Sequence, residues 1–332
     1  MARSHDSLPA LGAVLRGAGL TTRALAAWAG RARIAALPAH LDALAARPAT
    51  PADAMLALFV AGAELAPDRL RVPAGVIDAL AAHGLIERAG DRVRACVAIL
   101  PLGAALLVCD RRDAPVERDR VSWPDDSSHH LATALPPGRR ARWLDLACGS
   151  AYAPLDRPAL ATQIAAVDLN PRAVHHAQLG AQLSGVAHLT ATAGDIAAPQ
   201  PPADLVTCNA PIPPDPGPDR AALPGAPELW RHAEPGFFDR LWPALQRAAH
   251  PAGLIVVHAA RDALVAGLHG APGERVIVSY TPDGVRAFSV AWWRPDAPAR
   301  FVTAQRALTV DRPHLDPADR DAALASDAPG PC

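Results

Sequence analysis

Hydrophobic residues recur at helical spacing in the first third of the chain. Leu8, Leu11 and Leu15 are three or four positions apart and would share one face of a helix. Thr50 followed by Pro51 is a typical helix start, and a run of apolar residues comes directly after it. We therefore predict that the N-terminal region is mostly helical.

A change to strand spacing follows. The sequence predicts a helix over 76–80, a cap at Gly84, a turn at Gly90 and an alternating strand over 93–99. A second apolar run, "AALLVCD", comes after Gly103. Helices followed by a two-stranded ribbon predict a winged-helix-like domain over 1–120, which would bind nucleic acid, dock a substrate or serve as an accessory packing domain. Arginine only slightly outnumbers the acidic residues there, which favours packing.

From residue 140 onward, strand and helix signals alternate, which predicts an α/β fold with a doubly wound, Rossmann-like sheet of seven strands. The seven candidate strands are "RWLDLAC", "QIAAVDL", "HLTATAGD", "DLVTCNAP", "GLIVVHAA", "RVIVSYT" and "FSVAWWR". We expect this domain to span 121–311. Residues 312–332 are expected to form a flexible tail, because they offer little apolar surface to pack.

Polar residues or small-residue turns end the first four of these strands, so they would meet at one edge of the sheet. Asp145 lies in the first strand and Gly149 in the small-residue turn after it, where a ligand can approach the backbone closely. Asp168 ends the second strand, about 20 residues on, where a carboxylate can accept hydrogen bonds from ribose hydroxyls. The turn lacks the G-x-G-x-x-G spacing that seats a pyrophosphate. These features indicate a nucleoside ligand without phosphates, although each Asp alone could be a strand-end cap.

With "AGDI" and "NAPI" ending the third and fourth strands, the chain resembles the class I S-adenosylmethionine-dependent methyltransferases over roughly 122–294. The resemblance implies that Asp145 and the Gly149 turn hold the methionine portion, and that Asp168 holds the ribose. It implies that Asp195 and Ile196 hold the adenine. The full set of implied cofactor-binding residues is Asp145, Ala147, Gly149, Ala151, Asp168, Leu169, Asp195, Ile196 and Asn209.

"NAPI" is similar to the N-P-P-Y/F signature of methyltransferases that act on a planar nitrogen, such as release-factor glutamine methyltransferases and "small domain" enzymes of ribosomal RNA guanine. The resemblance implies that Asn209 and Pro211 are catalytic. An amide or exocyclic amine is a poor nucleophile, and carbonyl acceptors can grip its N–H groups and orient its lone pair. Ala210 and Ile212 depart from the signature, and Asn209 could instead cap the strand. The lost aromatic surface would come from Trp230, Phe237 or Phe238.

The segment "WPDDSSHHL" resembles a D-S-S-x-x-L stretch that precedes the first strand in "small domain" methyltransferases. In that setting Asp126 and Ser127 would lie over the cofactor or the acceptor. The alternative is an ordinary helix N-cap. The substrate-binding candidates are Asp126, Ser127, Ile212 and Trp230.

Composition limits the remaining possibilities. A formal net charge of -1 argues against a surface that binds nucleic acid mainly through its phosphates. The chain has no Lys, so its permanently charged basic side chains are all Arg. The 5 cysteines lack metal or disulfide spacing, and the 13 histidines form no metal motif, so we expect free thiols and no metal. No segment is expected to cross a membrane, and we expect a cytoplasmic location. The oligomeric state cannot be predicted.

We therefore predict an S-adenosylmethionine-dependent enzyme that methylates nitrogen, with a protein side chain or peptide-like amide as the first candidate acceptor. A ribosomal RNA base or a small molecule would be alternative acceptors. A non-catalytic regulator that senses a nucleoside and binds DNA is the remaining alternative.

Overall fold

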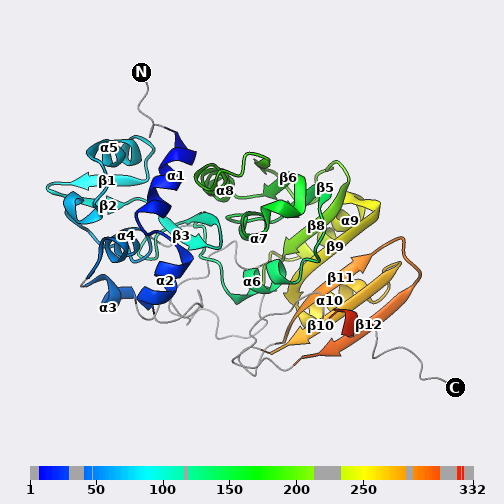
Figure 1. Ribbon diagram of the computed structural model, residues 1–332. Helices are drawn as coiled ribbons and strands as arrows, with labels where there is room; N and C mark the ends of the chain where they lie inside the picture. Colours follow the sequence, from blue (N-terminus) through cyan, green and yellow to red (C-terminus); the bar gives the residue numbers. More distant parts are fainter. Residues whose placement is uncertain are drawn as a thin grey trace.

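The computed structural model describes residues 7–29, 41–46, 48–115, 119–212, 233–281, 287–306, 320–322 and 324. An N-terminal part of short helices and hairpins lies beside a large sheet covered by helices (Figure 1). The helices are α1 (Leu8–Gly17), α2 (Thr22–Ala29), α3 (Leu41–Ala45), α4 (Pro51–Phe59), α5 (Ala74–Ala82), α6 (Asp126–Thr133), α7 (Tyr152–Asp156), α8 (Pro171–Ser184), α9 (Phe237–Ala248) and α10 (Arg261–Leu268). Two 3-10 turns are η2 (Pro67–Leu70) and η3 (Pro158–Leu160).

The strands form two hairpins and one large sheet. They are β1 (Ile86–Ala89), β2 (Arg92–Ala95), β3 (Ala98–Leu102), β4 (Ala105–Cys109), β5 (Arg140–Leu146), β6 (Ala161–Asp168), β7 (Leu189–Ala193), β8 (Ala203–Asn209), β9 (Ala249–Ala260), β10 (Glu274–Tyr280), β11 (Phe288–Arg294) and β12 (Arg300–Gln305).

The N-terminal part is helical, as its spacing predicted. Leu11 and Leu15 of α1 are fully buried, and α4 begins with a capping box in which Thr50 and Asp53 exchange hydrogen bonds. The single strand predicted over 93–99 is wrong. The chain breaks between β2 and β3, so that β2 pairs with β1 and β3 pairs with β4 in two separate hairpins.

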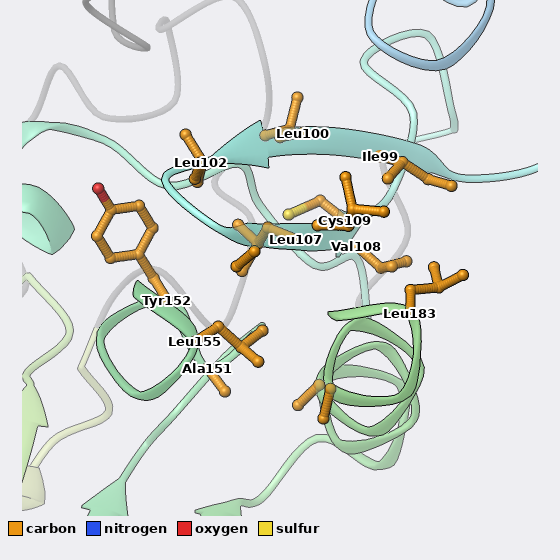
Figure 2. Packing of buried hydrophobic residues seen from close by; sticks show 14 of the residues in the cluster. Ile99, Leu100, Leu102, Leu107, Val108, Cys109, Ala151, Tyr152, Leu155 and Leu183 are labelled. Atoms are coloured by element: carbon orange, nitrogen blue, oxygen red, sulfur yellow. The ribbon is translucent and has the colours of Figure 1, made fainter. Parts of the chain in front are cut away.

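These N-terminal elements pack directly on the sheet domain. Gly12 of α1 lies so close to α8 that a Cβ built on it would be 1.8 Å from the Leu183 carbonyl oxygen. Figure 2 shows the β3–β4 hairpin over α7 and α8, with Leu107 and Val108 beside Leu155 and Leu183. One cluster of buried apolar residues therefore continues across residue 120. The winged-helix-like character and the domain boundary at 120 stay predictions.

The large sheet confirms the predicted α/β class. Its strand order is β12-β10-β11-β9-β8-β5-β6-β7, and β5, β6, β7, β8 and β9 are parallel. All seven predicted strands are present, but the sheet has eight: β12 adds a strand beside β10, so the predicted count of seven is wrong. In the sheet, β6 and β7 lie on one side of β5, and β8 and β9 lie on its other side, so the strand order reverses at β5. Such a switch point places a ligand at the carboxyl ends of the strands.

Three expectations from composition can be compared with the structure. The described cysteines, which exclude Cys332, are all free thiols. None of the helices described is both long and apolar enough to cross a bilayer. Most of the tail predicted over 312–332 lies outside the described residues.

Candidate active site

A cavity of about 250 Å³ opens at the carboxyl ends of the parallel strands. It collects residues that end four different strands, although they are distant in the sequence. The sequence-predicted residues that line it are Asp145, Ala147, Gly149, Asp168, Leu169, Asp195, Ile196, Asn209, Pro211, Ser127 and Ile212. The alignment of polar strand ends at one rim, which the sequence predicted, is therefore present.

The turn after β5 adopts a backbone that few side chains tolerate. Ala147, Gly149 and Ala151 all have positive φ, at 53°, 53° and 58°. A Cβ on Gly149 would meet no described atom within 4 Å, so this glycine keeps open the space in front of the backbone. The two alanines occupy left-handed positions where glycine is the usual residue, at a cost of roughly 1 to 2 kcal/mol each.

Asp168 ties this turn to the end of β6. One carboxylate oxygen, Oδ2, accepts the Gly149 backbone N–H at 2.8 Å, and the other, Oδ1, accepts that of Asn170 at 2.9 Å. Burial raises the pKa of Asp168, and these two backbone donors oppose the shift. Each carboxylate oxygen keeps lone-pair capacity for a further donor, which suits a diol such as ribose.

Asp145 is a carboxylate held inside the sheet at the cavity wall. It is 4% exposed and accepts a hydrogen bond from the Thr207 hydroxyl, which in turn accepts one from Trp143 Nε1 at 2.7 Å. Burial raises its pKa to about 7. No arginine in the described part of the chain contributes to this shift, so a ligand cation could compensate the charge.

The segments after β7 and β6 contribute a carboxylate and apolar surface, respectively. Asp195 Oδ1 accepts the Ala197 backbone N–H at 2.8 Å, and Arg240 of α9 reaches Oδ2 at 3.0 Å. Asp195 and Arg240 are both partly exposed at the cavity rim. Leu169, which is 47% exposed, is the one large hydrophobic side chain of the described residues that is exposed. It lines the same cavity and could cover an apolar, flat ligand group.

Asn209 ends β8 and contacts α6 directly in the cavity wall. Its Nδ2 donates to Ser127 Oγ at 2.9 Å and to Ser128 Oγ at 3.2 Å. The N-cap expected for the "DDSS" segment is confirmed, because Asp125 caps α6 by accepting the Ser127 N–H at 2.9 Å. Ser127 also lies in the cavity wall, whereas its place over the cofactor or the acceptor stays a prediction.

Some predicted site residues do not line the cavity. Ala151 is fully buried within the turn, and Asp126 is the first residue of α6, half-buried and outside the lining. Trp230 lies outside the described residues. Of the two candidate phenylalanines, Phe237 lines the cavity, whereas the Phe238 ring stacks on Trp242 at 5.8 Å.

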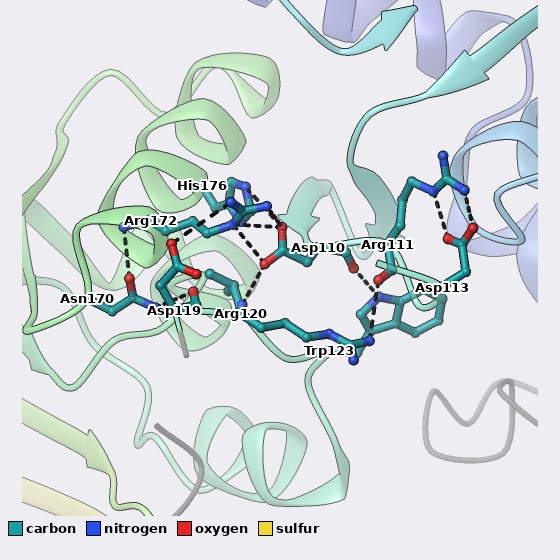
Figure 3. Close-up of polar contacts among 10 residues, drawn as sticks. Asp110, Arg111, Asp113, Asp119, Arg120, Trp123, Asn170, Arg172 and His176 are labelled. Atoms are coloured by element: carbon teal, nitrogen blue, oxygen red, sulfur yellow. Dashed lines mark hydrogen bonds and ion pairs between the residues drawn. The ribbon is translucent and has the colours of Figure 1, made fainter. Parts of the chain in front are cut away.

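A wall that the sequence did not reveal closes the cavity on the side of the N-terminal part. It consists of 120–124, within the segment that joins β4 to α6. Arg172 of α8 donates to both carboxylate oxygens of buried Asp110 (Figure 3). Asp110 Oδ2 also accepts the Val121 backbone N–H at 2.7 Å. Trp123 Nε1 donates to the Asp110 carbonyl at 2.9 Å. Asp110 thus couples the wall to both parts of the fold.

The residues described contain no group of three or more side chains that could hold a metal ion. The site is therefore built from carboxylates, amides and hydroxyls. Such a set binds and orients polar ligands through hydrogen bonds.

Comparisons with known proteins give a fold likeness. No family model matches the chain, and no curated protein matches it. A tRNA methyltransferase from M. jannaschii is 12% identical over 62% of this chain and 58% of its own, with a TM-score of 0.42. A 16S rRNA N2 methyltransferase from T. thermophilus, solved with AdoMet and guanosine, is 16% identical over 61% and 46%, with a TM-score of 0.41.

A ribosomal protein methylase from Lactobacillus delbrueckii is 15% identical over 51% of this chain and 76% of its own, with a TM-score of 0.35. The chain spans about half the length of the two RNA methyltransferases. In its α/β fold the chain is similar to these enzymes.

Proposed function

We propose that the protein is an S-adenosylmethionine-dependent methyltransferase that acts on nitrogen, with a protein side chain or peptide-like amide as the acceptor. One observation carries the proposal. Asp168 and Asp195 line the same cavity as Asn209, so residues suited to ribose, adenine and the acceptor nitrogen share one space. A dinucleotide would need a phosphate-binding turn, which the segment 147–151 lacks.

The residues present fit this cofactor. The raised pKa of Asp145 suits a carboxylate that becomes ionised opposite a bound cation such as an α-ammonium group. Asp168 would accept hydrogen bonds from the ribose hydroxyls, while Asp195, Ile196 and Leu169 would hold the adenine. When bound, S-adenosylmethionine supplies a methyl group that its sulfonium charge has already activated.

The acceptor side depends on Asn209 and the segment after it. Because the lone pair of an amide nitrogen is delocalised, binding and orientation must supply much of the rate enhancement. Asn209 Oδ1 and the backbone at Pro211 offer carbonyl acceptors for the N–H groups of the acceptor. Ile212 stands where the signature has an aromatic residue, so another residue must supply a flat surface for the acceptor. Trp123 and Tyr152 also line the cavity and offer such surfaces. The net charge of -1 favours a protein acceptor over RNA.

Transfer of a labelled methyl group tests the proposal. The protein is incubated with cell extract and methyl-labelled S-adenosylmethionine, and label is then measured in protein, RNA and small molecules. We expect label in protein, lost with Asn209→Ala although that variant still binds the cofactor. Label in RNA or in small molecules would contradict the proposed protein acceptor and identify RNA or a small molecule as the acceptor instead. No transfer to any fraction, together with a salt-sensitive shift of DNA in electrophoresis, would favour a DNA-binding regulator.

A further inference from the structure

A chain of side-chain hydrogen bonds leads from Asn209 into the interior of the sheet. Asn209 and His258 are register partners on β8 and β9, and His258 Nδ1 lies 3.0 Å from Asn209 Oδ1. His258 Nε2 lies 2.7 Å from the Tyr280 hydroxyl oxygen, on β10. His258 and Tyr280 are each 2% exposed, so bulk water does not compete for these bonds. On its other side, Asn209 donates to Ser127, and Ser127 donates to Asp125.

The Asp125 carboxylate, a hydrogen-bond acceptor at one end of this chain, fixes the direction of every hydrogen bond in it. The Asp125 carboxylate can only accept, so the Ser127 hydroxyl donates to it and offers its oxygen lone pairs to Asn209. Asn209 must therefore turn Nδ2 toward Ser127 and Oδ1 toward β9.

The same logic continues through the sheet. Since Oδ1 of Asn209 can only accept, His258 carries its proton on Nδ1 and leaves Nε2 bare. The bare Nε2 then accepts the Tyr280 hydroxyl proton.

We propose that His258 and Tyr280 are positioning residues that lock the side-chain amide of Asn209 in the orientation needed to receive the acceptor. In this chain, Nδ2 of Asn209 donates to Ser127 and Ser128, and one lone pair of Oδ1 accepts from His258. One lone pair of Oδ1 remains for an N–H of the substrate. The inference rests on the proposed function, because it assigns the support of the proposed acceptor-binding residue.

Burial keeps His258 and Tyr280 uncharged at neutral pH. Burial lowers the pKa of His258 to about 4, although Asp125 acts in the opposite direction. Burial also raises the pKa of Tyr280, with smaller contributions from Asp125 and Asp126, so its phenol stays protonated. The Phe288 ring stacks on the His258 imidazole at 5.8 Å and holds its plane.

The tautomer can be measured without any acceptor or cofactor. Long-range ¹H–¹⁵N correlation spectra of the ¹⁵N-labelled wild-type protein at pH 7 separate protonated from bare imidazole nitrogens. The signals of His258 are identified by their loss in His258→Asn. We expect Nδ1 protonated and Nε2 bare. A proton on Nε2 at pH 7, or a doubly protonated ring, would overturn the inference.

Variants test the effect on transfer. His258→Phe keeps a ring but removes the donor, and one neutral hydrogen bond corresponds to a fall in kcat of about threefold to tenfold. His258→Asn can place an amide nitrogen where Nδ1 lies, and it should recover part of that loss. Tyr280→Phe should lower kcat by about threefold, because Nε2 loses its donor. All three should bind S-adenosylmethionine as the wild type does.

Ser289→Ala is the matched control. It also removes a buried hydroxyl, which pairs with Ser279 at 2.7 Å between β10 and β11 but has no hydrogen bond to Asn209. It should leave kcat unchanged at a similar melting temperature. Unchanged kcat in His258→Phe, with wild-type transfer intact, sinks the inference and leaves the proposed function standing. Absence of cofactor binding and transfer in the wild type sinks the proposed function, whatever tautomer His258 shows.

Discussion

Replacing Asp145 with Asn should stabilise the protein in the absence of a ligand and abolish its response to S-adenosylmethionine. Burial raises the pKa of Asp145 from an ordinary 3.8 to about 7. Well below pH 3.8 the Asp145 carboxyl is protonated in both the folded and the unfolded states, so its burial costs no stability. As pH rises toward 7 the unfolded chain releases the proton first, so that stability is lost.

The size of this loss follows from the two pKa values. The difference between 3.8 and about 7 corresponds to roughly 4 kcal/mol of unfolding free energy, at about 1.4 kcal/mol per pH unit. Asn carries no charge, and its carbonyl can still accept the hydrogen bond from the Thr207 hydroxyl. We therefore expect a gain of up to about 4 kcal/mol at pH 8 and a smaller one at pH 5.

Thermal unfolding at pH 5 and pH 8, with and without saturating cofactor, measures both effects. Asp204→Asn is the matched control, since this carboxylate accepts two backbone N–H groups at the opposite end of β5, at 3.0 and 2.9 Å. It should show neither the stabilisation nor the loss of cofactor response. The reasoning is refuted if Asp145→Asn melts as the wild type does at pH 8, or if the cofactor stabilises both proteins equally.

Three further substitutions test other parts of the structure. Gly149→Ala should cost only about 1 kcal/mol of stability at its φ of 53°, but it should weaken cofactor binding at least tenfold by titration calorimetry, because the new Cβ enters the open space. Gly12→Ala should destabilise the protein by roughly 1 to 3 kcal/mol in chemical unfolding, because its Cβ meets the backbone of α8; Gly17→Ala in the same helix meets nothing described and should cost nothing. Asp110→Asn should lower stability by roughly 1 to 3 kcal/mol and weaken cofactor binding as well, because Arg172 and the cavity wall lose their shared anchor. An effect on stability alone would show that the wall does not depend on Asp110.

The sheet could be predicted because its buried strands, parallel and antiparallel alike, have continuous apolar runs in the sequence. Each of the seven runs forms a strand, and the polar residues that end the first four lie at one rim. The eighth strand, 300–305, was missed because it lies at the sheet edge and has polar residues at both ends. The alternation over 93–99 predicted one strand in place of two, because it continues through Cys96 and Val97, where the chain leaves one hairpin and enters the next.

The parts of the site that were missed depend on contacts between distant residues. Asp110 and Arg172 are 62 positions apart, and neither belongs to a motif. His258 and Tyr280 occupy ordinary strand positions, and their proximity to Asn209 follows only from strand order and register. Motif spacing identifies residues that approach a ligand through one turn, whereas support from neighbouring strands requires the structure.

Titration of S-adenosylmethionine into the wild type and into Asp168→Ala shows whether Asp168 binds the cofactor, with Asp204→Asn as the control. Two charge-assisted hydrogen bonds to ribose are worth about 3 kcal/mol or more, which corresponds to a loss of affinity of at least about 100-fold in Asp168→Ala. We predict binding to the wild type and to the control, with this loss in the variant. Equal affinity of the wild type and Asp168→Ala, or no binding to the wild type, would contradict the account.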